Sequence, residues 1–479
     1  MPGFDLDNSY AIIVILWLSG FFILYTVGLI VSYIVFFLMG IMNLGRYRHY
    51  VNVVDLHALF KTSLTKPVSI LVPAYNEERV IMESVRSLLT LHYPQFEVIV
   101  VNDGSADETM RVLIESFELV PVSKVYQRKI DTEPVKAIYE SRSNPNLVVV
   151  DKPNGGKSSA LNVGINVSQY PYFCTLDADS ILDSDALLKT MRPFIEHPDT
   201  MIAVGGVIRV ANNCVVDYGR VKEVNIAGNW LALAQTVEYL MTFLSSRIAF
   251  ARMGVVLLIS GAFGMFHKES VIEVGGYRED TIGEDMELVV RLNRILRKKG
   301  RRFRMFYNPD PVCWTEVPED LKSLAGQRRR WQKGLVDSIR YNGEMLFNPR
   351  FGLLGMFGMP YYLIFEMLGC VVELFGYVML IVFWLAGVLS LNWMLLWILM
   401  SMATGFMFTV LSVLVEELSF HRYRRVRDLF MLLWGGFLYN FGFRQINAVW
   451  RLQAMLEYLG GFRKLWGAIR RGGFRTAGS

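Results

Sequence analysis

Cysteines are few and widely separated in this chain of 479 residues. The four cysteines, Cys174, Cys214, Cys313 and Cys370, show no CxxC spacing. Their separation argues against a disulfide framework and against a zinc site built on paired cysteines. Reduced cysteines suit a domain that faces the cytosol.

Charged residues are also scarce, at 19% of the chain against 53% hydrophobic residues. The apolar excess lies in roughly the first forty residues and the last hundred and thirty, whereas the middle has the composition of a soluble protein. This distribution predicts a membrane protein with a large water-facing domain. The net charge of +5 is small for this length, and we predict no nucleic-acid partner.

Charge is missing altogether between Tyr10 and Met39. Because about 20 apolar residues span a hydrocarbon core, this segment predicts a transmembrane helix. Asp5 and Asp7 precede it, where a secretory signal would carry basic residues, so we expect an uncleaved anchor. The basic residues follow the helix: Arg46, Arg48, His49, Lys61 and Lys66. The positive-inside rule then predicts an external N-terminus and a cytosolic middle domain.

Further apolar stretches cover residues 353–389, 391–415 and 429–450. The basic loop 421–427 prefers the cytosol, which fits two crossings before it. The basic tail from Arg463 to Arg475 prefers the cytosol too, which conflicts with a third full crossing. Either the last stretch is re-entrant or interfacial, or the rule does not hold for it. Glu366 and Glu373, seven residues apart and so expected on one helix face, either line a cavity or pair with a neighbouring arginine.

The stretch from Trp230 to Ile259 is apolar but is interrupted by Glu238, Arg247 and Arg252. It also precedes motifs that must stay in the cytosol. We therefore expect amphipathic helices that pack on the domain or on the membrane interface.

In the middle of the chain, short β-branched runs alternate with helical patterns. The runs are Val68–Val72, Phe96–Val101, Leu147–Val150 and Tyr172–Leu176. This alternation predicts a parallel sheet with helices on both faces, whose ligands bind outside the carboxyl ends of the strands. Polar clusters that include Asn76, Glu77, Asp103, Lys157, Asp177 and Asp179 follow the four strands. Together they predict a ligand site.

Asp177 and Asp179 follow the fourth strand as a D-x-D pair. Mg²⁺ and Mn²⁺ bind one or two carboxylates plus substrate phosphates, and a metal there would neutralise a diphosphate leaving group. An isolated D-x-D is more typical of a solvated turn that caps the next helix through Ser180. The position at a strand end favours the metal.

Two other polar residues at strand ends leave alternatives open. Asp103 either accepts hydrogen bonds from a base or ribose hydroxyl or forms an Asx-turn. Lys157 follows Gly155 and Gly156 and either approaches a phosphate or simply follows a turn, because the spacing is not that of a Walker A motif.

Two downstream motifs carry groups suited to transfer chemistry. Asp285, in Gly283-Glu284-Asp285, either acts as a general base or stabilises a helix N-terminus. Gln327, Arg330 and Trp331 share a helix face at spacings i, i+3 and i+4. A guanidinium beside an indole suits a diphosphate and a sugar ring, although a basic juxtamembrane helix also binds anionic headgroups.

The motifs PAYNEE, VNDGS, GGKSSALN, DADS, SGAF, GED and QRRRW follow one another between about residues 67 and 335. In this order they resemble the processive family 2 glycosyltransferases, the group that contains cellulose, hyaluronan, chitin-oligosaccharide and poly-N-acetylglucosamine synthases. The resemblance implies an α/β GT-A domain inserted between transmembrane helices. The implied parts are an N-terminal transmembrane helix (1–45), a cytosolic GT-A domain (46–314), interfacial helices with QxxRW (315–350), and C-terminal transmembrane or interfacial helices (351–479).

The resemblance also implies a role for each motif residue. The UDP-sugar would contact Ala74, Tyr75, Glu77, Asp103, Lys157 and Asp177. Asp179, with Asp177, would hold Mg²⁺ or Mn²⁺, and Asp285 would be the catalytic base. Gln327, Arg330 and Trp331 would cover the diphosphate and the acceptor end, which Ser260 and Gly261 would border. The family has T-E-D where this chain has G-E-D, so a threonine contact is missing.

The implied function is an inverting transferase that builds a β-linked polysaccharide, with UDP-N-acetylglucosamine favoured over UDP-glucose. Its partners would be the UDP-sugar, the growing glycan, the bilayer and, as candidates to test, accessory export subunits. The enzyme would be a multi-pass protein of the inner (plasma) membrane. Trp384, Trp393, Trp397 and Trp434 would either stack on sugars in a channel or face lipid. The alternative function is a non-processive transfer of one sugar to a lipid or polyprenyl phosphate.

Overall fold

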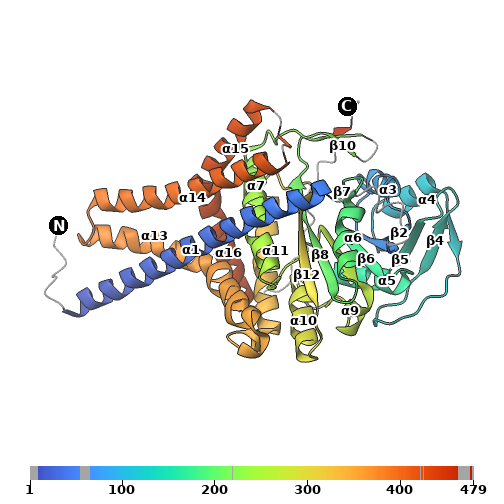
Figure 1. Ribbon diagram of the computed structural model, residues 1–479, viewed down its shortest axis with the longest axis horizontal. Coiled ribbons are helices and arrows are strands. Elements are labelled where there is room, and N and C mark those ends of the chain that lie inside the picture. The colour runs from blue at the N-terminus through green and yellow to red at the C-terminus, as the bar shows by residue number, and fades with distance from the viewer. Residues whose placement is uncertain are drawn as a thin grey trace.

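A mixed sheet forms the core of the domain on the right of Figure 1. The computed structural model describes residues 9–53, 65–217, 220–420, 422–423, 425–461 and 475–476. Within these residues, ten strands form one sheet in the order β3-β4-β5-β2-β1-β6-β11-β8-β12-β7.

The four strands predicted from the sequence lie side by side in this sheet. They are β1 (Val68–Ala74), β2 (Phe96–Asp103), β5 (Leu147–Lys152) and β6 (Tyr172–Leu176). Neighbouring strands in the run β5-β2-β1-β6 pair in parallel, as predicted. Their carboxyl ends therefore open at one edge of the sheet.

The remaining strands make the sheet mixed. The β3 (Leu119–Val122) and β4 (Ala137–Ser141) strands form an antiparallel edge. On the other side, β11 (Phe263–His267) pairs antiparallel with both β6 and β8 (Met201–Val210). The β12 strand (Arg304–Thr315) runs parallel to β8, and β7 (Ser180–Leu182) runs antiparallel to β12. The antiparallel β11 was not predicted from the sequence.

Helices cover both faces of the sheet. The α3 (Ile81–Leu89), α4 (Thr109–Phe117) and α6 (Ala186–Glu196) helices share one hydrophobic cluster with the sheet, and α5 (Lys157–Val167), α9 (Lys268–Glu273) and α10 (Glu284–Lys298) share the other. In β1, Ile70 and Val72 belong to the first cluster and Leu71 to the second. Successive side chains of a strand point to opposite faces, so a strand buried on both sides reads as a continuous apolar run.

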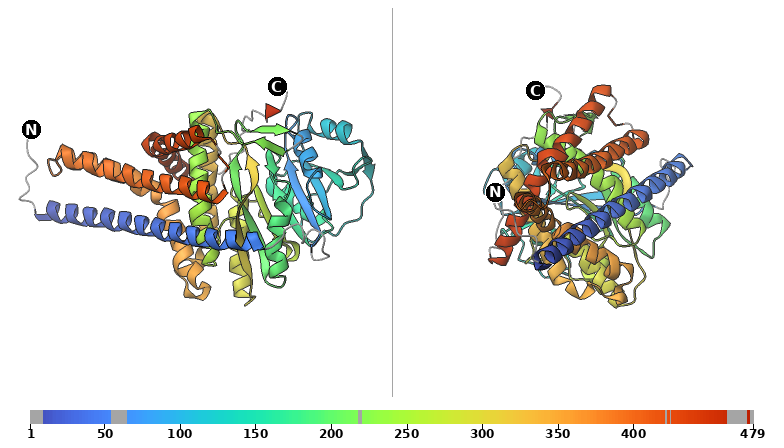
Figure 2. Two further views of the ribbon diagram at one scale, coloured as in Figure 1. Left: turned by 45° about the horizontal axis from the view of Figure 1, so that its top comes forward. Right: turned by 90° about the vertical axis from the view of Figure 1, so that its left-hand side faces the viewer.

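Three long apolar helices project from the same end of this domain: α1 (Ser9–Val53), α13 (Gly369–Leu385) and α14 (Leu391–Phe420) (Figures 1 and 2). Ring contacts of Phe22 with Phe375 and of Tyr33 with Phe408 join them. Among the described residues, Ile13–Gly45 and Leu391–Phe420 are long and apolar enough to cross a membrane. A third candidate span combines Leu354–Met367 with Gly369–Leu385 and bends by 44° at the break.

The last apolar stretch, 429–450, is broken into α15 (Val426–Leu438), a π-helical turn η6 (Tyr439–Phe443) and α16 (Arg444–Leu459). The backbone leaves helical geometry at Phe441 and Gly442. It is not among the candidate spans, which agrees with the re-entrant or interfacial alternative. The β13 strand (Arg475–Thr476) pairs with β9 (Val215–Asp217), which brings the end of the chain back to the domain.

Several basic residues used for the predicted orientation lie outside the described residues. They are His421, Arg424, Lys61, the tail residues 462–474, and the side chains of Arg46, Arg48, His49 and Arg475.

The apolar stretch after Trp230 folds into α7 (Trp230–Met241), a π-helical turn η1 (Thr242–Arg247) and α8 (Ile248–Arg252). The α7 helix packs on the domain as predicted, but it is not amphipathic. Leu233 packs toward α15, Ala232 toward β8, and Leu231 toward α11 (Leu321–Tyr341). The helix is covered on several sides because it lies between the sheet and the C-terminal helices.

Candidate active site

The loops that follow β1 and β2 are tied to one another. The Asn76 backbone adopts a left-handed conformation, with φ of 56°, and its side-chain oxygen accepts a hydrogen bond of 2.8 Å from the Ala106 amide. The Glu77 amide donates to Thr109 Oγ1 at 2.8 Å. The first polar cluster is therefore held against the second, while Tyr75 stays 44% exposed.

Asp103 anchors the loop that leads into α5. Its carboxylate accepts hydrogen bonds from Lys152 Nζ at 2.6 Å, from the Gly155 amide at 3.0 Å and from the Gly156 amide at 2.7 Å. Asp103 and Lys152 are both buried. These long-range contacts differ from the local Asx-turn and place Asp103 beneath the glycine pair, whereas contact with a nucleotide stays a prediction.

Lys157, the first residue of α5, lies between carboxylates. Its Nζ is 2.6 Å from Asp177 Oδ1 and 3.4 Å from Glu284 Oε1. Burial alone would lower the pKa of this ammonium, but the nearby carboxylates of Asp177, Glu284 and Asp285 raise it above its usual value. Burial raises the pKa of the Glu284 carboxyl, against the lowering effect of Lys157. Lys157 is thus a fixed positive charge beside the D-x-D pair.

Asp285 lies in the first turn of α10, where the helix dipole favours a negative charge. Its Oδ2 accepts a hydrogen bond of 2.9 Å from the Gly261 amide, and its Oδ1 accepts one of 2.8 Å from the Met286 amide. A Cβ at Gly261 would lie 2.9 Å from Lys157 Nζ, so a larger residue there would require the Lys157 ammonium to shift. The SGAF and GED motifs therefore meet at the Asp285 carboxylate.

The α11 helix carries the QRRRW motif and packs directly on the GED loop. A Cβ at Gly283 would lie 2.6 Å from the Cα of Gly334, and a Cβ at Gly334 would lie 2.7 Å from the Cα of Gly283. This backbone contact leaves no room for the threonine that the resemblance leads one to expect before Glu284. The glycine that stands in place of the threonine therefore allows the close packing between the GED loop and α11.

One cavity of about 1220 Å³ joins most of the predicted site. The predicted residues that line it are Lys157, Asp177, Asp179, Ser260, Gly261, Asp285, Gln327, Arg330 and Trp331. Ala74, Tyr75, Glu77 and Asp103 do not line it and lie at the ends of β1 and β2. The wall continues onto the long helices, with Tyr33 from α1, Phe408 from α14 and Arg451 from α16.

The comparisons identify the part of the chain that supplies one side of this cavity. Residues 69–275 match the family described as "Glycosyl transferase family 2". This region is a family 2 glycosyltransferase domain. The poly-β-1,6-N-acetyl-D-glucosamine synthases of Staphylococcus aureus (strain COL) and Staphylococcus epidermidis are 31% and 30% identical to this chain over 268 residues. The match covers 56% of this chain and 54% of each synthase, so the chain spans about half the length of these curated relatives.

A solved structure shares the fold of the glycosyltransferase domain and its flanking helices. It is the mannosyltransferase PcManGT from Pyrobaculum calidifontis, in complex with GDP-mannose and Mn²⁺. The likeness has a TM-score of 0.54 at 17% identity and covers 92% of this chain and 99% of that one. At this identity the likeness shows the fold alone, and it confirms the predicted GT-A class.

In the glycosyltransferase domain, two carboxylates are suited to bind a divalent cation together with the diphosphate of a substrate. Asp177 and Asp179 both line the cavity. Within the described part of the chain, no group of three or more His, Cys, Asp or Glu side chains is arranged to hold a metal. Two carboxylates are enough for Mg²⁺ or Mn²⁺ when substrate phosphates and water complete the coordination shell.

The two glutamates of the first C-terminal stretch take different roles. Glu366 lines the cavity, whereas Glu373 pairs with Arg444 at 3.0 Å and accepts a hydrogen bond from Tyr377 at 2.7 Å. The expectation that both lie on one face of a single helix was wrong, because the helix is broken at Leu368 between them. Glu366 therefore lines a cavity, and Glu373 pairs with a neighbouring arginine, which are the two alternatives that the sequence left open.

The tryptophans considered for a channel do not line the cavity. Trp384, Trp393, Trp397 and Trp434 are 40%, 60%, 46% and 56% exposed. Their exposure on the outer surface of apolar helices supports the lipid-facing alternative.

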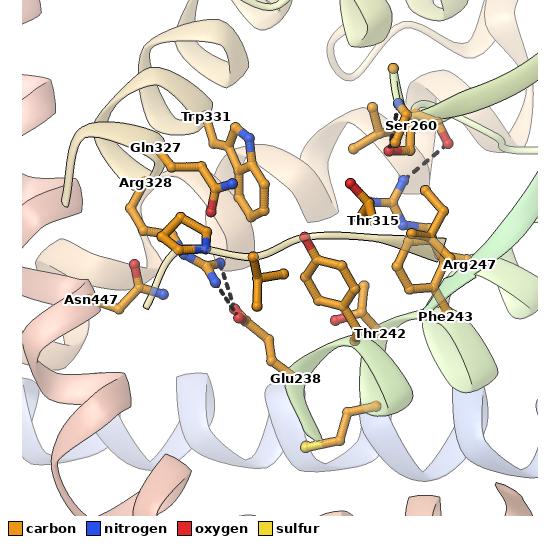
Figure 3. Close-up of a pocket in the computed structure, with 18 of the residues that line it drawn as sticks. Glu238, Thr242, Phe243, Arg247, Ser260, Thr315, Gln327, Arg328, Trp331 and Asn447 are labelled. Atoms are coloured by element: carbon orange, nitrogen blue, oxygen red, sulfur yellow. Dashed lines mark hydrogen bonds and ion pairs between the residues drawn. The ribbon is translucent and has the colours of Figure 1, made fainter. Parts of the chain in front are cut away.

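Sequence reasoning assigned no role to Glu238 and Arg328. Glu238 of α7 accepts hydrogen bonds from both terminal nitrogens of Arg328 of α11, one of them at 2.8 Å (Figure 3). Both residues line the cavity. In the sequence, Glu238 stands out as an acidic residue inside an apolar stretch, and Arg328 is the second residue of QRRRW. No local pattern shows that these two residues form a pair, because they are 90 positions apart.

Proposed function

We propose that this chain is a membrane-embedded inverting glycosyltransferase that polymerises a β-linked polysaccharide from a UDP-sugar. One observation carries the proposal: a single cavity holds the Asp285 carboxylate, the QRRRW helix and side chains of the long apolar helices. The likeness to poly-β-1,6-N-acetyl-D-glucosamine synthases favours UDP-N-acetylglucosamine over UDP-glucose as donor.

Asp285 would act as the base. The Gly261 and Met286 amides hold its carboxylate, so it needs no reorientation when an acceptor hydroxyl binds. Asp285 accepts the hydroxyl proton while the oxygen attacks the anomeric carbon and UDP leaves from the opposite side. This single displacement converts an α-linked donor into a β linkage.

Positive charge would stabilise the leaving diphosphate. Arg330 lines the cavity and would neutralise the charge that develops on UDP, with Lys157 beside the D-x-D pair. Mg²⁺ or Mn²⁺ bound by Asp177 and Asp179 would supply further neutralisation. The uridine would lie at the ends of β1 and β2, against Ala74, Tyr75, Glu77 and Asp103.

The acceptor would approach from the side of the long helices. Ser260, Gly261, Gln327 and Trp331 would border its terminal sugar, and the cavity continues past them to Glu366 and Arg451. Polar groups at this depth suit glycan hydroxyls, which supports coupling of synthesis to passage across the membrane, with or without export subunits.

The arrangement of the helices supports an orientation with an external N-terminus. In the proposed path, α1 enters the cytosol, the bent segment that ends in α13 leaves it, and α14 returns. The chain then ends on the side of the domain, where β13 pairs with β9. In this proposal the domain would lie in the cytosol and the enzyme in the inner (plasma) membrane, with the chain divided at 45, 314 and 350 as proposed from the sequence.

A second candidate is the transfer of one sugar to a lipid or polyprenyl phosphate. It is favoured by the aromatic side chains of Tyr33, Phe37 and Phe408, which line the cavity from apolar helices and suit a lipid tail. The length of the product separates the two functions.

The test is UDP release by the purified, detergent-solubilised full chain in Mg²⁺ or Mn²⁺, with UDP-N-acetylglucosamine and UDP-glucose offered separately. We expect turnover of UDP-N-acetylglucosamine, polymer on a gel, and loss of both in Asp285→Asn. A product one sugar longer than a lipid acceptor would favour the second candidate. Release of UDP from neither donor would contradict the proposal.

A further inference from the structure

The indole of Trp331 has a cation against one of its faces. The guanidinium carbon of Arg328 lies 4.5 Å from the centre of the ring, whereas Trp331 remains 47% exposed and lines the cavity. Figure 3 shows Trp331 and Arg328 side by side on α11. Arg328 covers one part of the indole, and the part that stays exposed in the cavity is available to a ligand.

Arg328 is itself held from two other elements. Glu238 of α7 binds both of its terminal nitrogens, and the ring of Phe443 in η6 lies 5.7 Å from its guanidinium carbon. Arg328 is only 4% exposed and Phe443 only 2% exposed. A planar guanidinium can bind a carboxylate with its edge and contact aromatic rings with its faces at the same time, which the ammonium of a lysine cannot do.

We propose that Arg328 and Glu238 are positioning residues that hold Trp331 as the platform for the terminal sugar of the acceptor. Without them the indole is free to populate other rotamers, and the acceptor hydroxyl is displaced from the Asp285 carboxylate. The platform is built from α7, α11 and η6, so the turn that breaks the last apolar stretch supports the acceptor end of the site. The nature of the acceptor rests on the proposed function.

The first variant is Arg328→Lys, which keeps the charge but loses the bidentate pair and the flat contact. The second is Arg328→Met combined with Glu238→Gln, which removes both charges and leaves neither buried alone. The matched control is Arg329→Lys, because Arg329 is the next residue of α11 and pairs with Glu457 but does not line the cavity.

The enzyme is assayed with UDP-N-acetylglucosamine and an oligosaccharide of β-1,6-linked N-acetylglucosamine as acceptor. We expect the KM for the oligosaccharide to rise about tenfold in both variants, which is the size of a lost cation–π contact. The KM for the donor and the melting temperature should change little in Arg328→Lys, and Arg329→Lys should behave as the native chain.

A double-mutant cycle tests whether Arg328 acts through the indole. In a Trp331→Ala background, Arg328→Lys should have no further effect on the KM for the oligosaccharide. An equal effect in both backgrounds, or an unchanged acceptor KM in both variants, would overturn the inference.

A readout without turnover separates this inference from the proposed function. In protein labelled with 5-fluorotryptophan, the ¹⁹F resonance of Trp331, assigned with Trp331→Phe, should shift in Arg328→Lys and stay in place in Arg329→Lys. If the native chain releases no UDP from UDP-N-acetylglucosamine, the proposed function fails, whereas the resonance still decides the inference. A resonance that is unchanged in Arg328→Lys overturns it.

Discussion

The two ends of the site are built in different ways. At the ends of β1 and β2, polar side chains bind the loops themselves, and the Asp103 carboxylate is satisfied by Lys152 and the glycine amides. After the end of β6 and in the first turn of α10, the carboxylates of Asp177, Asp179 and Asp285 line a cavity that the long helices help to form. The first end is a rigid frame, and the second keeps its polar groups at a surface where a substrate can bind. A change at the buried Asp103 should act on stability, and changes at the carboxylates of the second end should act on turnover.

The largest expected effect is a loss of turnover at the end of the site that lines the cavity, and it requires no mutation. Removal of divalent cations with EDTA should lower UDP release to background, because the metal ion held by Asp177 and Asp179 would neutralise the leaving diphosphate, which the two carboxylates cannot do themselves. Activity should return on addition of Mn²⁺ or Mg²⁺, with no change in melting temperature. Full turnover in EDTA would show that Lys157 and Arg330 suffice without a metal.

Asp285→Asn should lower kcat by about 10²–10⁴-fold, the usual contribution of a general base. The amide keeps the shape of the carboxylate but cannot accept the hydroxyl proton at a useful rate. Affinity for UDP, measured by titration calorimetry, should be unchanged. Retention of kcat would move the base to another acid of the cavity, with Glu284 the nearest candidate by sequence.

Asp103→Asn should act at the rigid end by destabilising the fold. It leaves the buried Lys152 ammonium without its carboxylate, a change that costs about 3–5 kcal/mol for a buried pair. Chemical unfolding of the detergent-solubilised full chain measures the effect. The control is Asp131→Asn in an exposed ion pair with Arg128, which should change stability by less than about 0.5 kcal/mol. Equal stability of the two variants would contradict the rigid-frame interpretation.

Gly334→Ala should give the smallest effect and lies at the cavity end, where α11 packs on the GED loop. Its methyl group would stand 2.7 Å from the Cα of Gly283, so the GED loop and α11 must separate, at about 1–3 kcal/mol of unfolding free energy. Activity should fall with stability because Asp285 moves relative to Trp331. Gly326→Ala on the same helix meets nothing within 4 Å and should be neutral or stabilising. Similar melting temperatures and activities for both variants would show that the close contact is not required.

Much of the fold was accessible from the sequence because it depends on local patterns. The runs around Ile70 and Val100 predicted buried parallel strands, and the strand ends predicted the place of Asp177. The antiparallel β11 was not predicted, because the short run Phe263–His267 shows no feature of its orientation. The break at Phe441 was not predicted either, since apolar composition alone does not report a turn in the backbone.

The sequence by itself determined the alternation of strands and helices in the domain, the polar residues at the strand ends and the existence of the long apolar helices. These properties follow from residue type and periodicity, which are local. Only the tertiary structure decided which groups meet: Asp103 with Lys152, Gly283 with Gly334, and Glu238 with Arg328. Such pairs are set by the packing of elements distant in the chain, because burial stabilises a charge or a close backbone contact only where the matching group arrives from elsewhere.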